Sequence, residues 1–85
     1  MEVSPEFERD YRKLCAKNAG LRRSVDRKVA QVIQNPLHYK PLKAPLQGVR
    51  RVHVEGSFVL LFEPDGSREV VRFIRLAHHD EAYGI

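Results

Sequence analysis

The chain has 85 residues, which allows one domain spanning residues 1–85 with a single small hydrophobic core. Its 42% hydrophobic and 31% charged residues are typical of a folded globular protein, and the longest apolar run, residues 58–62, is far shorter than the roughly 20 residues of a membrane span. The single cysteine, Cys15, excludes an internal disulfide framework, so we expect a cytoplasmic protein without a membrane partner.

Positive charge is concentrated between residues 9 and 51. The net charge of the whole chain is +4, yet this segment carries twelve basic and only two acidic side chains, a local net charge of +10. Such a field attracts a polyanion, with RNA or DNA as the first candidates, or an acidic protein partner. A basic surface that serves only solubility is the alternative interpretation.

Two helices are predicted in the N-terminal part. Ser4 followed by Pro5 is a typical helix start, and apolar side chains then follow at helical spacing until residues 18–20 end the helix. A second helix over residues 21–35 ends at Pro36. The short connection between the two helices predicts an antiparallel helical hairpin.

A proline-containing loop and three strands follow. Residues 36–48 contain three prolines, so we expect a loop, which could act as a basic flap. From residue 49 the hydrophobic period changes to two, and turn sequences separate strands over residues 49–54, 58–62 and 69–76, to which residues 2–3 could add a short edge strand. We therefore expect an α+β fold, in which the helical hairpin packs on a small antiparallel β-sheet meander.

Strand alternation divides the side chains between the two faces of the sheet. It places Arg51 and His53 on one face of the first long strand and Arg50 on the other. In the last strand it places Phe73 on one face and Leu76 on the opposite face.

The histidines are the main chemical signal of the sequence. His53 lies on a predicted strand, and His78 and His79 directly follow the last strand, so the fold could bring one of them to His53. Two imidazoles with a cationic side chain can cleave RNA without a metal, one as base for the ribose 2′-OH and one as acid for the departing 5′-oxygen. His53 could equally be an ordinary exposed strand residue, and the other two could belong to a polar tail.

Other chemistries have less support in the sequence. The potential ligands at residues 78–81 are consecutive, so their side chains diverge, and neither an HExxH motif nor a second cysteine is present. Cys15 lies beside an apolar helical stripe, and the five glycines are isolated, so they form no phosphate-binding loop. We therefore expect neither a metal nor another cofactor.

Two segments carry a resemblance to a known family. PLKAPLQGVRRVHVE, residues 41–55, resembles the centre of toxins of the RelE/ParE superfamily and is most similar to its YafQ-like branch. HDEAYG, residues 79–84, resembles the C-terminus of these toxins, where a histidine or basic residue precedes an aromatic residue by four positions. The resemblance implies a RelE-like fold and a toxin of a type II toxin–antitoxin module. Such a toxin would cleave mRNA in the ribosomal A site without a metal and would be inhibited by its antitoxin.

The resemblance also implies roles for individual residues. By position, His53 and His79 match the acid–base histidines of the YafQ-like site, and Tyr83 matches the C-terminal aromatic residue that would orient the substrate. Arg51 lies where RelE-like members carry a basic residue, and Lys40 lies where the YafQ-like branch has a further histidine; both would stabilise the phosphate. Further RNA contacts are expected from Lys43, Arg50, Arg75 and His78.

The expected partners are the cognate antitoxin, the ribosome and mRNA, with DNA contacted only through an antitoxin complex.

One alternative function is a non-enzymatic, ParE-like topoisomerase inhibitor, and another is an inactive homologue that only binds an antitoxin. The histidine-rich face argues against the topoisomerase inhibitor. A plain RNA-binding module would need exposed aromatic residues, whereas Phe58, Phe62 and Phe73 occupy positions suited to a core.

Overall fold

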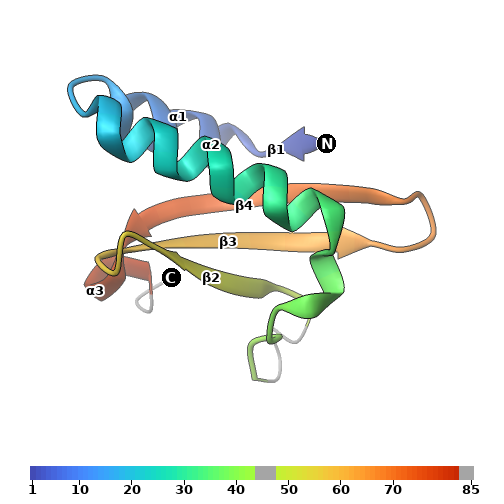
Figure 1. Cartoon of the computed structure of the whole chain (residues 1–85). Helices are drawn as coiled ribbons and strands as arrows, with labels where there is room; N and C mark the ends of the chain where they lie inside the picture. Colours follow the sequence, from blue (N-terminus) through green and yellow to red (C-terminus); the bar gives the residue numbers. More distant parts are fainter. Residues whose placement is uncertain (44–47, 83–85) are drawn as a thin grey trace.

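The computed structural model describes residues 1–43 and 48–82. Two helices, α1 (Pro5–Cys15) and α2 (Ala19–Gln34), lie over one face of a four-stranded sheet (Figure 1). The strands are β1 (Glu2–Val3), β2 (Arg50–Val54), β3 (Phe58–Asp65) and β4 (Val70–His78), in the spatial order β1-β4-β3-β2. The remaining elements are a single 3-10 turn, η1 (Pro36–His38), and a short helix, α3 (His79–Ala82). The expected α+β fold, with a helical hairpin on a small sheet, is confirmed.

Both long helices begin at side-chain caps. The hydroxyl of Ser4 accepts the Phe7 N–H at 2.9 Å, and the side-chain oxygen of Asn18 accepts the Leu21 N–H at 2.9 Å. Each cap satisfies a backbone donor that has no partner inside its helix. The caps therefore define the helix starts, and that of α1 is the start predicted from Ser4 and Pro5.

The N-terminal segment closes one edge of the sheet. β1 pairs in parallel with β4, with Glu2 opposite Arg72, which confirms the expected edge strand. Immediately after β1, the Ser4 N–H donates to the Phe73 carbonyl at 2.9 Å, and the Ser4 hydroxyl donates to the Ile74 carbonyl at 2.6 Å. The backbone of β4 is therefore occupied along this edge, which protects it from pairing with another chain.

The main core lies between the helices and the sheet. The ring of Phe73 packs against Phe7 of α1 at 5.8 Å and against Phe62 of β3 at 6.1 Å, measured between ring centroids. Leu21 and Val25 of α2 are fully buried in the same cluster. These contacts confirm that Phe62 and Phe73 serve the core; Phe58 is half-buried against it.

A β-bulge makes one predicted face assignment wrong. Leu61 pairs with Arg75 while Phe62 pairs with Phe73, so Ile74 has no partner in β3. The extra residue turns Leu76 back toward the helices, where it joins Phe73 in the main core, while Ile74 remains on the opposite face. Simple alternation had separated Leu76 from Phe73.

A second, smaller apolar cluster covers the sheet face opposite the helices. Val59, Leu61 and Ala77 are buried there. Leu42, from the proline-containing loop, packs against this cluster, and its N–H donates to the Val49 carbonyl at 2.8 Å. The loop is therefore held against the face that strand alternation assigns to Arg51 and His53.

Candidate active site

Two histidines from distant parts of the chain meet on this open face of the sheet. The rings of His53, in β2, and His79, the first residue of α3, are stacked with their centroids 5.7 Å apart and their planes at 26°. His53 is exposed, and 45% of the His79 side chain is exposed. A substrate can therefore reach both imidazoles from solvent.

The turn between β2 and β3 holds His79 in position. The main-chain N–H of His79 donates to the Ser57 carbonyl at 2.7 Å, which ties the start of α3 to this turn. The turn itself has positive φ values at Glu55 (54°) and Gly56 (74°), and Ser24 of α2 donates to the Glu55 carboxylate at 3.0 Å. Glycine adopts such a φ without steric cost, whereas Glu55 is held there against its preference.

Asp80 lies beside His79 and can orient its ring. Its Oδ1 is 3.4 Å from Nδ1 of His79. An imidazole that donates its Nδ1 proton to this carboxylate presents Nε2 to a substrate. The sequence interpretation did not assign a role to Asp80; the signal was its position directly after His79.

Basic side chains come from β2 itself and from the loop that packs on this face, where Pro41 pairs with Arg50, three residues before His53. Arg51 is half-buried in β2, two residues before His53 and on the same face by strand alternation. Lys40 and Lys43 are exposed on either side of Leu42, which anchors their loop to this face of the sheet. The open face therefore carries two imidazoles and, in the same strand as His53, the cationic Arg51.

The structure places two other predicted residues elsewhere. The His78 ring packs edge-on against Phe58, 5.7 Å away, and so lies on the side of the main core rather than beside His53. The Arg50 guanidinium donates to the Tyr39 carbonyl. Tyr83 lies outside the residues that the structure describes.

Arg75 is engaged in an ion pair with helix α1. Its Nε donates to the Asp10 carboxylate at 2.7 Å and its Nη2 at 3.3 Å, and these hydrogen bonds raise the pKa of Arg75 above its ordinary value. The same carboxylate accepts the Leu76 N–H at 3.0 Å. This internal ion pair favours a structural role for Arg75 over the RNA contact predicted from the sequence.

A metal site and a reactive thiol each set requirements with which the described residues can be compared. No three His, Cys, Asp or Glu side chains in these ranges are grouped to hold a metal ion. Cys15 is buried, and burial raises the pKa of its thiol, which disfavours the nucleophilic thiolate. In the same ranges, no helix combines the length and apolar character needed to cross a membrane.

Fold and site together define a class of small proteins in which a helical hairpin packs on one face of a sheet and a pair of histidines lies on the other face. A family model described as the ParE toxin of the type II toxin–antitoxin system parDE matches residues 1–83. A Methanocaldococcus jannaschii protein named as a candidate toxin, RelE4, is 35% identical over 83 residues, covering 98% of this chain and 88% of that protein. The chain therefore belongs to the RelE/ParE superfamily of type II toxin–antitoxin toxins.

Solved structures agree with this assignment. YafQ from Escherichia coli strain BL21(DE3) superposes with a TM-score of 0.78 at 26% identity, covering 98% of this chain and 96% of YafQ. YafQ in the E. coli DinJ–YafQ complex gives the same TM-score, identity and coverage. The RelE-like fold inferred from the two sequence motifs is thereby confirmed.

Proposed function

We propose that this toxin is a ribosome-dependent endoribonuclease that cleaves mRNA in the ribosomal A site and so inhibits translation. The observation that carries the proposal is the stacked pair of His53 and His79 on an accessible face of the sheet. Membership of the superfamily and similarity to YafQ agree with it.

In this mechanism the two imidazoles act in opposite protonation states. The neutral ring removes the proton from a ribose 2′-OH, the resulting oxygen attacks the adjacent phosphorus, and the bond from phosphorus to the 5′-oxygen breaks. The protonated ring supplies the proton that the 5′-oxygen takes up. In the transition state the 2′-oxygen and the 5′-oxygen are both partly bonded to the same phosphorus, so two rings 5.7 Å apart suit the task.

Cationic groups have two tasks in this proposal. Arg51 and Lys40 stabilise the negative charge that grows on the phosphorane-like transition state, and Tyr83 orients the substrate base. Lys43 and the exposed basic side chains of the helices attract the RNA backbone, consistent with the net charge of +10 between residues 9 and 51.

The proposal includes a cognate antitoxin as the protein partner. The E. coli DinJ–YafQ structure is described as a toxin–antitoxin complex. The basic segment would also attract an acidic partner, because its field is largely uncompensated within residues 9–51.

A second candidate function follows from the family description, which names ParE. A ParE-like toxin would inhibit a topoisomerase without cleaving RNA, and the histidine pair would then have no catalytic task.

One experiment separates the two functions. The purified toxin is incubated with programmed ribosomes carrying mRNA, with the same mRNA alone, and with a topoisomerase in a supercoiling assay. We expect a discrete cut in the A-site codon only when ribosomes are present, with supercoiling unaffected. Inhibited supercoiling together with intact mRNA would refute the ribonuclease and support the ParE-like function.

A further inference from the structure

A carboxylate distinguishes the two histidines of the open face. Oδ1 of Asp80 lies 3.4 Å from Nδ1 of His79, whereas His53 makes no hydrogen bond or ion pair with the part of the chain that the structure describes. The two rings are stacked on each other, and both are accessible to solvent. Since an opposite charge at this distance favours the protonated form of an imidazole, the pair is electrostatically asymmetric.

The main chain directs this carboxylate to His79 rather than to His78. The Asp80 N–H donates to Nδ1 of His78 at 3.4 Å. A nitrogen that accepts a hydrogen bond carries no proton, so Nδ1 of His78 does not donate to Oδ2 of Asp80, 3.9 Å away. Nδ1 of His79 faces an ionised carboxylate, which only accepts, so this nitrogen carries its proton. The neutral rings of His78 and His79 are thus held in opposite tautomers.

Neighbouring carboxylates do not duplicate this contact. Glu55, in the turn between β2 and β3, accepts a hydrogen bond from Ser24 at 3.0 Å. Arg75, in β4, pairs with Asp10 at 2.7 Å, and the charge of Glu81, the third residue of α3, acts on the same guanidinium. Within the described residues, none of these carboxylates has a hydrogen bond to either ring of the stacked pair.

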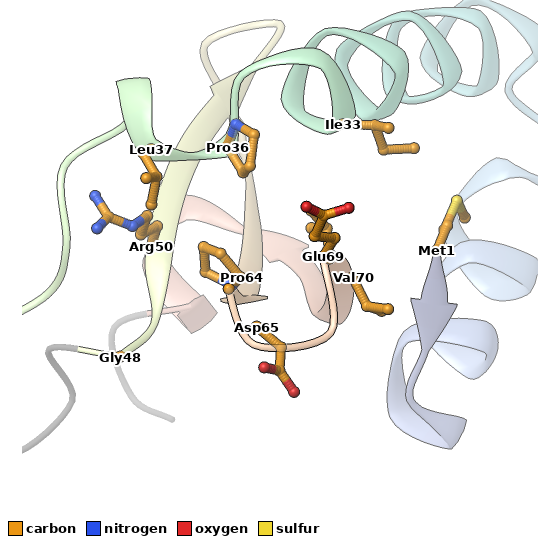
Figure 2. Close-up of a pocket in the computed structure, with 12 residues that line it drawn as sticks. Met1, Ile33, Pro36, Leu37, Gly48, Arg50, Pro64, Asp65, Glu69 and Val70 are labelled. Carbon is orange, nitrogen blue, oxygen red and sulfur yellow. The ribbon is translucent and has the colours of Figure 1, made fainter.

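Two further carboxylates lie at the other end of the sheet. Asp65 and Glu69 line a groove beside the turn between β3 and β4 (Figure 2). β4 has nine residues, so its ends lie about 30 Å apart at the usual rise per residue, and His79 follows the far end. Exposed charges interact weakly beyond about 8 Å in physiological salt. The carboxylates in the groove therefore do not act on His79.

Arg51 adds to the asymmetry from the side of His53. It lies two residues before His53 in β2 and on the same face by strand alternation, so their Cα atoms are about 7 Å apart. Its positive charge disfavours a second positive charge on His53. The stacked rings also disfavour double protonation, because their centroids are only 5.7 Å apart. A single proton on the pair is therefore best placed on His79, beside Asp80.

We propose that Asp80 is a positioning residue that keeps the proton of the pair on His79, so that His79 is the general acid and His53 the general base. His53 takes the proton of the ribose 2′-OH, the 2′-oxygen bonds to phosphorus, and the bond from phosphorus to the 5′-oxygen breaks. The 5′-oxygen receives the Nε2 proton of His79, which keeps its Nδ1 proton on Asp80. The division of roles rests on the proposed ribonuclease function, but the contact between Asp80 and His79 does not.

The pH dependence of mRNA cleavage on programmed ribosomes tests the division of roles. Asp80→Asn is compared with the wild type and with Glu81→Gln, which removes the same charge one residue later in α3. Without the Asp80 carboxylate His79 loses its proton at lower pH, so the alkaline limb of the rate profile should move down. Since 85% of the Asp80 side chain is exposed, we expect a two- to fivefold effect, a shift of about 0.3–0.7 pH unit. Glu81→Gln should keep the wild-type profile.

Nitrogen-15 NMR of the free toxin tests the contact without ribosomes. At a pH at which the rings are neutral, we expect the His79 proton on Nδ1 in the wild type and in Glu81→Gln. Asp80→Asn can present either its oxygen or its NH₂ group to Nδ1, so the preference should be lost. His78 serves as an internal reference, because its partner is the main-chain N–H, which both variants keep. Equal melting temperatures of the two variants exclude a folding defect.

Three outcomes would overturn the proposal. The first is a shift of the acidic limb instead of the alkaline limb in Asp80→Asn, which would make His79 the base. The second is a pH profile of Asp80→Asn that matches those of the wild type and of Glu81→Gln. The third is a His79 tautomer that does not change in Asp80→Asn. Absence of RNA cleavage by the wild type would contradict the ribonuclease proposal, and the NMR result alone would then decide whether Asp80 positions His79.

Discussion

The Asp10 carboxylate joins α1 to the bulged part of β4 through hydrogen bonds. It accepts hydrogen bonds from Nε and Nη2 of Arg75 at 2.7 and 3.3 Å and from the Leu76 N–H at 3.0 Å. The Asp10 and Arg75 side chains are only 15% and 29% exposed. Asp10→Ala would therefore leave a half-buried guanidinium and a backbone N–H without their acceptor.

The expected loss of stability is large for a chain of this size. Removing one partner of a buried ion pair costs about 3–5 kcal/mol. Because Arg75 keeps some access to water, we expect Asp10→Ala to lower the free energy of unfolding by about 2–4 kcal/mol. A domain of 85 residues has a total stability of about 4–13 kcal/mol, so this variant is strongly destabilised.

Urea denaturation followed by circular dichroism measures this effect. The control is Arg68→Ala, which breaks exposed ion pairs with Asp65 and Glu2 and should lower the unfolding midpoint much less than Asp10→Ala does. The double variant Asp10→Ala/Arg75→Ala should lose less than the sum of the two single variants, because neither charge is then left unpaired. If Asp10→Ala unfolds at the same urea concentration as Arg68→Ala, the structural role assigned to the pair is wrong.

Two smaller predictions concern other titratable groups. Cys15 should react slowly with iodoacetamide in the native protein and rapidly in urea, because it is buried and its pKa is raised; rapid native alkylation would contradict this. Hydrogen bonds from Arg68 and Ser67 lower the pKa of Asp65 to about 2. Its ionised form therefore favours the folded state above about pH 4, and this contribution is lost as the pH falls toward 2. Asp65→Asn should make stability less dependent on pH in that range, and an acid-unfolding curve parallel to that of the wild type would argue against this linkage.

Local signals in the sequence predicted most elements of the fold. The cap and proline at Ser4 and Pro5 placed the start of α1 correctly, since a cap acts within a few residues. The bulge at Ile74 was not predicted, because it depends on the register between β3 and β4 and not on any local pattern. β3 also runs to Asp65, through Pro64, where the sequence suggested a turn.

The candidate site was predicted in part. Alternation placed Arg51 and His53 together, and the resemblance favoured His79 over His78. The structure agrees with that choice, because His79 stacks on His53 whereas His78 contacts Phe58. The pairing of Arg75 with Asp10 joins residues far apart in sequence, so spacing gave no signal for it. The catalytic roles themselves remain predictions.

The most direct test of the central proposal is mRNA cleavage on programmed ribosomes by His53→Ala and His79→Ala. The matched control is His38→Ala, an exposed histidine in η1 rather than in β2 or α3. We predict that His53→Ala and His79→Ala each lower the rate of mRNA cleavage about a hundredfold or more, as expected for loss of a general acid or base. The control should keep the wild-type rate. A folded His53→Ala or His79→Ala toxin that cuts at the wild-type rate would contradict the proposed mechanism.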